Sequence, residues 1–463
     1  MEGATSFRPD IEGLRAVAVL AVVAYHADLG PFPGGYVGVD VFFVVSGFLI
    51  TTVLLRDIEV GGARALPGFW ARRARRLLPA STLVVASTLL AARFLLDPIG
   101  RRALGHDAVD AAVFIVNLVF IHRQSDYLAA QLAPSPLLHF WSLAVEEQFY
   151  LVWPFVLLLA TRVRRHRRLV LVMVIGGCAA LSLAACVWYT DHHQPVAFFS
   201  LPTRAWELLA GAVLAASGGH LARLSRVLRC VAGWGGLAAI AWTVTGYGDR
   251  TVFPGWAATV PVAATVSIVA AGVGVGAPGG RDVRGTVGRV LGRAPLQWIG
   301  RRSYAIYLWH WPALTLAAAR FGPLAGWQRA ASIGVAVVLA AISFRLVEDP
   351  VRRARWATAS PRRGLVLGAG LVLTSVTAGL AVVALPARVD GGGRAATATL
   401  ATLPSGTVAS TRPSPTVAAP VTTGPEPSST SAAPVSTDAP TTVGVGPSAL
   451  DQLVAINAGV IAQ

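Results

Sequence analysis

The sequence contains no lysine, few cysteines and little charge of either sign. All 39 basic residues are arginine, and charged residues occupy only 13% of 463 positions, about half of what a soluble domain carries. Hydrophobic residues make up 54%, and the mean hydropathy is +0.60. Cys178, Cys186 and Cys230 lie in or beside apolar runs and form no CxxC pair, which excludes a disulfide framework. The composition therefore predicts an all-α polytopic membrane protein.

The net charge of +16 raises the question of a nucleic-acid partner. The arginines are expected in short loops between apolar runs, where the positive-inside rule accounts for most of them. The sequence has no zinc-finger spacing and no RNA-binding motif, so we expect no nucleic acid partner. No cleavable signal peptide is recognisable, and the first apolar run is interpreted as a membrane span.

The apolar runs predict eleven spans. They cover residues 11–28, 37–55, 77–96, 138–160, 169–189, 202–217, 228–245, 256–274, 296–318, 330–347 and 364–385. Arginine clusters follow every second span, and all five clusters are cytoplasmic if a further apolar run at 108–121 does not cross the membrane. That run is short and contains Asp110 and Asn117, so we interpret it as re-entrant or interfacial. The N-terminus is then cytoplasmic and the C-terminal tail extracytoplasmic.

The chain is predicted to have four parts. Residues 1–355 form the membrane domain, and residues 356–386 add one more transmembrane helix. Residues 387–447 consist mainly of Ala, Thr, Ser, Pro, Val and Gly, which cannot bury enough surface to fold, and are expected to be a disordered extracytoplasmic linker. Residues 448–463 regain helical periodicity and are interpreted as a short helical remnant.

The first two apolar runs carry polar groups that a lipid anchor does not need. Arg15 and His26 are eleven residues apart, which places them on one helix face about 16 Å from each other. Asp40 and Ser46 lie in the second run. An ionisable group at membrane depth is costly, so these residues are candidates for a function. The alternatives are that His26 only bonds to neighbouring backbone and that Arg15 only snorkels to the headgroups.

Several motifs also carry a resemblance to a known family. RPDIEGLRA at 8–16, the spacing of Arg15 and His26, FFVVSGF at 42–48 and RRARRLLPA at 72–80 resemble the membrane-bound acyltransferase-3 family, which includes O-acetylases of cell-surface polysaccharides. Further similar blocks lie at 138–154, 202–211, 299–312 and 343–352. The resemblance implies a ten-helix core, to which this chain adds an eleventh span. Many relatives continue into an SGNH-type hydrolase domain, and this sequence lacks its GDSH-like block.

The first two spans supply the predicted base. Imidazole titrates near the working pH, so His26 suits removal of a proton from an acceptor hydroxyl, and the resemblance assigns it the same role. Arg15 would orient the donor. Asp40 would orient His26 or pair with Arg15. Ser46 would contact the substrate or serve helix packing, which are equally favoured.

Two further motifs suggest donor and proton-transfer groups. Residues 69–80 hold an RxxR pattern, Arg72 and Arg75, and an overlapping one, Arg73 and Arg76, whose guanidinium groups suit the phosphates of coenzyme A. Positive-inside anchoring is the alternative, and the resemblance favours phosphate binding for Arg72 and Arg75. Glu146 and Tyr150 share a helix face, and Glu147 is expected to point elsewhere. Glu146 takes the family's position, and an arginine partner is expected for it.

His139, just before Glu146, is expected at the outer surface. The remaining candidates lie later in the chain. Arg204 and Glu207 are predicted to form an ion pair, for which a helix-locking role is at least as favoured as a catalytic one. Tyr307 belongs to an aromatic helix face that could bind substrate or form an interfacial belt, and His310 is a second candidate base. No metal site is predicted, since the adjacent histidines at 192–193 lack a third ligand.

These residues predict a membrane O-acyltransferase. It would move an acyl group, most simply acetyl, from cytoplasmic acyl-CoA to a hydroxyl of a cell-surface glycan or glycolipid. No permanently bound cofactor is expected, and acetyl-CoA is a co-substrate. Direct transfer is favoured over an acyl-enzyme on Ser46. The alternative is a proton-coupled transporter or flippase, which intramembrane charges also suit but which predicts an internal repeat that the sequence lacks. A third alternative is an inactive scaffold.

Overall fold

The computed structural model describes residues 7–124, 134–162, 167–217, 221, 224–273 and 285–384, and these residues form helices with no strand among them. The predicted all-α class is confirmed. The helices that coincide with predicted spans are α1 (Pro9–His26), α2 (Gly38–Gly61), α3 (Leu66–Leu95), α6 (Phe140–Thr161), α7 (Arg167–His192), α9 (Leu201–Ala216), α11 (Arg226–Gly246), α12 (Thr259–Ala271), α14 (Ala294–Phe321), α15 (Gly326–Ser343) and α18 (Pro361–Ala384).

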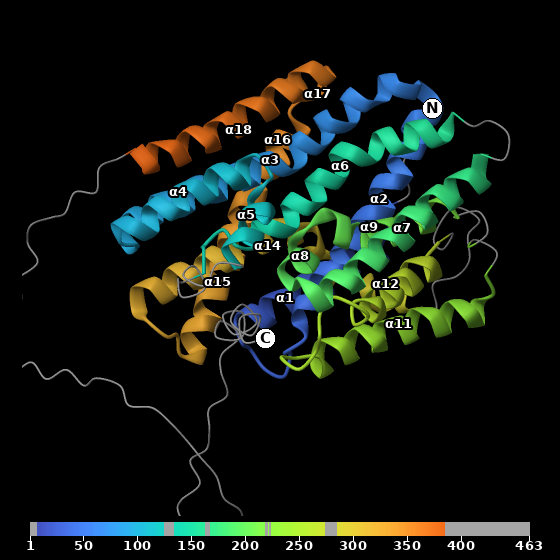
Figure 1. Cartoon of the computed structure of the whole chain (residues 1–463), viewed down its shortest axis with the longest axis horizontal. Helices are drawn as coiled ribbons and strands as arrows, with labels where there is room; N and C mark the ends of the chain where they lie inside the picture. The colour runs from blue at the N-terminus through green and yellow to red at the C-terminus, as the bar shows by residue number, and fades with distance from the viewer. Residues whose placement is uncertain are drawn as a thin grey trace, which may run out of the picture. The chain divides into compact units, whose positions relative to one another are not determined.

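Further helices lie between them. They are η1 (Gly35–Val37), η2 (Gly62–Ala65), α4 (Pro98–Ala112), α5 (Val116–Gln124), α8 (Gln194–Phe199), α13 (Val287–Leu291), η4 (Phe344–Glu348), α16 (Asp349–Arg353) and α17 (Arg355–Thr358). The additional helix expected within 356–386 is α18, which packs against α3 and α4 (Figure 1). The predicted linker at 387–447 and helical remnant at 448–463 lie outside the described residues.

The protein is a polytopic membrane protein. Within the described residues, six helical segments are long and apolar enough to cross a membrane: Gly35–Leu95, Phe140–Thr161, Leu169–His192, Arg226–Gly246, Gly326–Arg353 and Pro361–Ala384. The other predicted spans, α1, α9, α12 and α14, are shorter or more polar than these segments. Helices α1, α9 and α14 each bury a long face against neighbouring helices, so protein rather than lipid surrounds their polar groups.

Two elements differ from simple apolar runs. The run at 108–121 is not one helix, because α4 ends at Ala112 and α5 begins at Val116, with Phe114 between them at a φ of 58°. Helix α3 begins at Leu66, eleven residues before the predicted span, with Pro67 in its first turn. The arginines at 72–76 therefore lie on α3 and not in a loop, because nothing between Pro67 and the apolar run breaks the helix.

The tertiary contacts join helix ends that the predicted topology places on one side of the membrane. At the predicted outer side, Asp28 after α1 forms an ion pair with Arg329 on α15. At the predicted inner side, the Gln297 side-chain amide donates to the Pro9 carbonyl oxygen at 2.6 Å. The ends of helices far apart in sequence thus contact each other, and α1 lies against both α2 and α14 (Figure 1).

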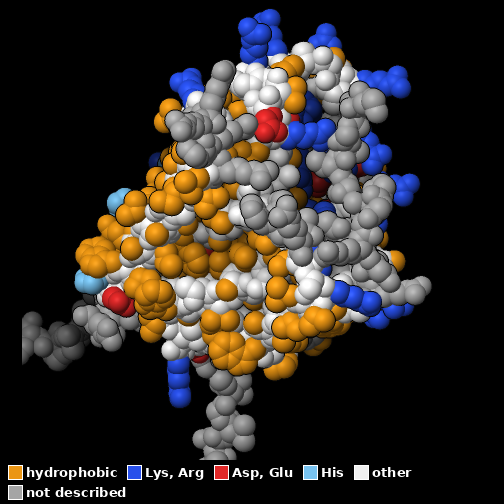
Figure 2. All heavy atoms as spheres, turned by 90° about the vertical axis from the view of Figure 1, so that its right-hand side faces the viewer, with side chains coloured by type: hydrophobic (Ala, Val, Ile, Leu, Met, Phe, Trp, Pro, Cys, Tyr) orange, Lys and Arg blue, Asp and Glu red, His pale blue; other side chains and the backbone are white. Residues whose placement is uncertain are grey.

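Figure 2 shows two kinds of side chain on the face of the molecule that lies on the right in Figure 1. Hydrophobic side chains cover much of the left and lower parts of this face, whereas arginine side chains gather along its upper and right-hand margins. This division matches a bundle whose flank contacts lipid and whose basic end contacts water and headgroups.

Candidate active site

A cavity of about 490 Å³ lies between α1, α2, α3, α6 and α14. It brings together seven of the predicted site residues, namely Arg15, Ser46, Arg72, Arg75, Glu146, Tyr150 and Tyr307. Arg73, Arg76, Ser142, Ser303, Tyr304 and Arg352 complete its polar lining, and the remaining walls are apolar side chains such as Phe42, Leu49 and Ile50. The volume suits a small-molecule ligand or part of a larger one.

The cavity is strongly basic. Six arginines line it, four of them from the first turns of α3, against one carboxylate, that of Glu146. Arg72 is paired with Asp57 of α2, the Arg75 guanidinium donates to the Ala357 carbonyl oxygen at 3.0 Å, and Arg15 lies 3.3 Å from Glu12. These contacts hold the guanidinium groups around one space, which favours an anionic ligand.

Arg73 is a site residue that the sequence reasoning missed. Its guanidinium lies over the Tyr150 ring, 4.0 Å from the ring centroid, and 3.9 Å and 3.8 Å from the carboxylates of Glu146 and Glu147. Tyr150 donates its hydroxyl hydrogen to Glu146. The predicted arginine partner of Glu146 is thus confirmed. The overlapping second RxxR pattern, from Arg73 to Arg76, was the signal that could have identified it.

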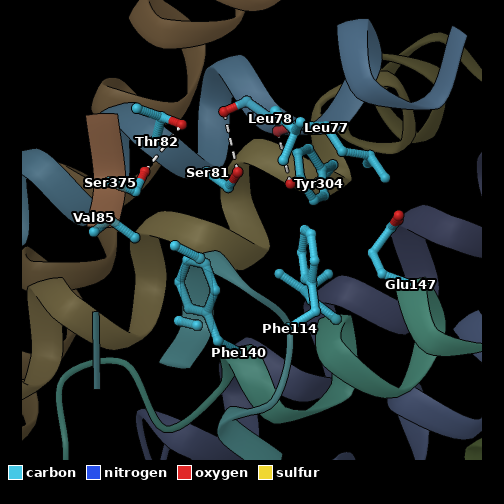
Figure 3. Close-up of a pocket in the computed structure, with 13 residues that line it drawn as sticks. Leu77, Leu78, Ser81, Thr82, Val85, Phe114, Phe140, Glu147, Tyr304 and Ser375 are labelled. Atoms are coloured by element: carbon cyan, nitrogen blue, oxygen red, sulfur yellow. Dashed lines mark hydrogen bonds between the residues drawn. The ribbon is translucent and has the colours of Figure 1, made fainter. Parts of the chain in front are cut away.

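Glu147 faces a different space from Glu146, although both carboxylates share Arg73. Figure 3 shows Glu147 at the edge of a small cavity of about 20 Å³, near Tyr304 and Leu77. Apolar side chains such as Phe140 form much of its wall, and the Tyr304 hydroxyl donates to the Leu77 carbonyl oxygen at 3.0 Å. This cavity has room for a single water molecule and not for a substrate.

His26 and His310 form a direct pair. His26 is the last residue of α1, and its Nδ1 lies 2.9 Å from Nε2 of His310 on α14. The two rings meet edge to edge, with centroids 5.1 Å apart and planes 16° apart, and Trp311 lies beside them. The two residues proposed from sequence as a first and a second base therefore belong to one unit.

His139 does not lie at the outer surface as expected. It is 2% exposed, and its Nε2 donates to the Leu308 carbonyl oxygen at 3.1 Å. Its ring centroid is 5.6 Å from that of His310. The expectation was wrong because α6 begins inside the bundle against α14, and no local sequence pattern reports that packing.

Tyr307 lies beside both the cavity and the histidine pair. Its hydroxyl donates to the His139 carbonyl oxygen at 3.0 Å and lies 2.7 Å from Ser142 Oγ, and both Tyr307 and Ser142 line the cavity. On the other side, the Tyr307 ring lies 5.4 Å from the His310 ring. His26 and His310 are not part of the cavity lining, so among the predicted site residues Tyr307 is the one that both lines the cavity and contacts the histidine pair.

The expectation that Asp40 orients His26 or pairs with Arg15 is wrong. Asp40 lies 3.1 Å from Arg204, whose other nitrogen lies 3.0 Å from Glu207, so the predicted Arg204–Glu207 pair is confirmed. All three side chains are at most 1% exposed, and none lines the arginine-rich cavity. Helix packing of α2 on α9 brings Asp40 to Arg204, which fits the helix-locking role rather than contact with a donor.

The described residues contain no group of three or more His, Cys, Asp or Glu side chains placed to hold a metal ion. His192, one of the adjacent histidines, stacks on Trp188 with ring centroids 4.4 Å apart.

A helical membrane bundle with a basic cavity beside buried histidines is the class of protein that these observations define. Residues 8–346 match the acyltransferase domain family, and the chain belongs to this family. It is 34% identical over 361 residues to the peptidoglycan O-acetyltransferase OatA of Listeria monocytogenes, an alignment covering 74% of this chain and 56% of the relative. It is 32% identical over 368 residues to the putative peptidoglycan O-acetyltransferase YrhL of Bacillus subtilis, covering 74% and 55%.

A third relative is the O-acetyltransferase OatA of Staphylococcus aureus, 30% identical over 357 residues, which cover 75% of this chain and 57% of the relative. The chain thus spans somewhat more than half the length of these relatives. No solved structure matches the chain.

Proposed function

We propose that this protein is a membrane O-acetyltransferase of the cell envelope. It would take acetyl from cytoplasmic acetyl-CoA, a co-substrate rather than a bound cofactor, and transfer it to a hydroxyl of an extracytoplasmic glycan, with peptidoglycan the first candidate. The family membership and the names of the relatives support the reaction class and the acceptor. The N-terminus would be cytoplasmic and the C-terminal tail extracytoplasmic, as the arginine clusters indicate.

The observation that carries the proposal is the basic cavity at one end of α1 and the histidine pair at the other. Arg72 and Arg75 would contact the coenzyme A phosphates, because guanidinium groups bind phosphate oxygens in pairs. Arg15 would orient the donor from α1. His26 would remove the acceptor proton about 16 Å further along the helix. Ser46, in the cavity wall, would contact the donor chain.

The second half of the site would orient these groups. Tyr150 and Arg73 both contact Glu146, and Arg73 also packs on the Tyr150 ring. These contacts hold the Glu146 carboxylate in a fixed position at the cavity wall. Tyr307, in the cavity wall and beside the His310 ring, would have to move or be passed for the acetyl group to reach His26, which does not line the cavity. Asp40, Arg204 and Glu207 would act on the site through the packing of α2 on α9.

The test is release of free coenzyme A thiol from acetyl-CoA by purified protein with a cell-wall glycan acceptor. We expect release that depends on the acceptor and falls about 10²-fold or more in His26→Ala, since general base catalysis contributes a factor of that order. A carrier of an envelope precursor needs no thioester, so absence of release from folded wild-type protein across several acyl-CoAs and acceptors would favour transport instead.

The same assay tests the arginines. Arg75→Ala should raise the KM for acetyl-CoA about tenfold or more, the size of a lost charge-assisted hydrogen bond, with a smaller effect on kcat. Arg64→Ala is the matched control, because Arg64 is exposed in η2 and does not line the cavity. Equal KM values in the two variants would argue against phosphate binding at Arg75.

A further inference from the structure

We propose that His310 is a positioning residue that sets the tautomer of His26, and that it is not an alternative base. The geometry of the histidine pair carries this inference; only its kinetic consequence rests on the proposed function. His310 is fully buried, whereas His26 is partly buried at the end of α1.

The Tyr307 carbonyl oxygen decides where the proton of His310 lies. His310 Nδ1 is 2.6 Å from this oxygen, which lies on the preceding turn of α14. A carbonyl oxygen can only accept a hydrogen bond, so Nδ1 of His310 must be the nitrogen that carries the hydrogen. In the neutral ring, Nε2 of His310 then has no hydrogen and presents its lone pair.

That lone pair decides where the proton of His26 lies. His310 Nε2 is 2.9 Å from His26 Nδ1, and since His310 Nε2 accepts, His26 Nδ1 must donate. His26 Nε2 is then the nitrogen with a free lone pair. No described residue hydrogen-bonds His26 Nε2, so this lone pair is available to an acceptor hydroxyl.

His310 would act on His26 as the orienting carboxylate acts on the histidine of a hydrolase triad, with an imidazole in place of the carboxylate. It also explains why His310 is unsuited to be the base, because both of its nitrogens are already engaged, one by the Tyr307 carbonyl oxygen and one by His26. Sequence order could not reveal this division of roles, since His26 and His310 are 284 residues apart.

In the proposed step, every bond that forms or breaks and the proton that moves can be accounted for. As the hydroxyl oxygen of the acceptor attacks the thioester carbonyl carbon, its O–H bond breaks and His26 Nε2 takes the proton. The C–S bond then breaks, the new C–O ester bond remains, and the coenzyme A thiolate receives the proton from Nε2. While His26 carries the additional proton, its Nδ1–H bond to His310 Nε2 stabilises the imidazolium, so His310 acts mainly on the transition state.

The direct test reads the tautomer and not the activity. We would record ¹⁵N spectra of histidine-labelled full-length protein in lipid nanodiscs, at a pH where His26 is neutral, and assign its signals by their loss in His26→Ala. We expect His26 in the Nδ1–H form in wild type and a mixture of tautomers in His310→Phe, which keeps an aromatic ring at the site but provides no acceptor. His139→Gln, which removes the neighbouring buried histidine, should leave the His26 signals unchanged.

The kinetic test separates positioning from packing. His310→Phe should lower kcat about 10²-fold with an unchanged KM for acetyl-CoA, because His310 does not line the donor cavity. His310→Gln places a side-chain carbonyl oxygen near the position of Nε2 and should recover much of the lost rate. A double variant, His26→Ala with His310→Phe, should be no slower than His26→Ala alone.

Two results would overturn the inference. One is His26 in the Nε2–H form in wild type, or a tautomer that does not change in His310→Phe. The other is full loss of activity in His310→Gln together with a normal tautomer of His26, which would assign the base to His310. If wild-type protein releases no thiol at all, the proposed function fails, but the spectra still decide the tautomer.

Discussion

Arg204 illustrates how this protein accommodates a buried charge. Its guanidinium lies between Asp40 and Glu207, and the centroids of four aromatic rings lie 5.5–5.9 Å from it. Those rings belong to Phe43, Trp141, Phe198 and Phe253. A cation in such a place is retained only while its partners remain, because its desolvation is otherwise uncompensated.

Replacing Arg204 should therefore destabilise the fold rather than alter donor affinity. Arg204→Leu leaves two buried carboxylates without a cation, and we expect a loss of about 3–5 kcal/mol in the free energy of unfolding. Thermal unfolding in detergent, followed by circular dichroism, measures this. Arg320→Leu is the control, since Arg320 is exposed at the end of α14 and should change stability little. Similar melting temperatures for both variants would contradict the structural role.

Some side-chain contacts could be predicted from the sequence, and others could not. Arg204 and Glu207 are three residues apart on one helix, so their spacing alone predicted the pair. The contact of Asp40 with Arg204 spans 164 residues, and that of His26 with His310 spans 284. Such partners depend on how whole helices pack. The chemistry of Asp40 alone does not decide which of several buried arginines it pairs with.

At the scale of helices, α2 and α9 approach closely because glycine faces backbone on both sides. A Cβ atom at Gly47 would meet the Leu208 backbone, and one at Gly211 would meet the Val44 carbonyl oxygen. Neither backbone can move without shifting its helix. The contact therefore holds together Asp40 and Ser46 on α2 and Arg204 on α9.

Gly47→Ala should separate α2 from α9 and cost about 1–3 kcal/mol of stability, the range for overpacking a close contact. Its matched control is Gly235→Ala on α11, where an added Cβ has no atom within 4 Å. The control should be neutral or more stable by about 0.5–1 kcal/mol, because alanine loses less conformational entropy in a helix. Denaturation of both variants in the same detergent compares them, and equal destabilisation would refute the close-contact argument.

Helices were predictable where an apolar run is long and uninterrupted, as in α7 and α18. They were less predictable where polar residues continue a helix or where a helix ends without a residue that breaks it. The arginines at 72–76 resembled a loop by composition, yet they continue α3, since arginine is a good helix former. The break at Phe114 has no glycine or proline to announce it, and packing of α4 and α5 against different helices imposes it.

For the molecule as a whole, the arginine clusters predict which loops face the cytoplasm. Arg64 in η2 should be inside and Asp249, between α11 and α12, outside, and both are exposed. In a background with Cys178, Cys186 and Cys230 replaced by alanine, an impermeant thiol reagent applied to intact cells should label Asp249→Cys and not Arg64→Cys. Permeabilised cells, in which both should react, provide the control. The reverse pattern would invert the topology and move the basic cavity to the outer side.

The hydrogen bonds of Tyr307 have a consequence for the membrane in which the protein works. An open channel from the arginines to the histidines would let protons and small ions run down their gradients across the bilayer. Tyr307, held by Ser142 and by the His139 carbonyl oxygen, lies in the cavity wall, and the lining of the cavity includes neither His26 nor His310. A cavity that does not extend to the histidines leaves the resting protein able to keep the two sides of the membrane electrically insulated from each other.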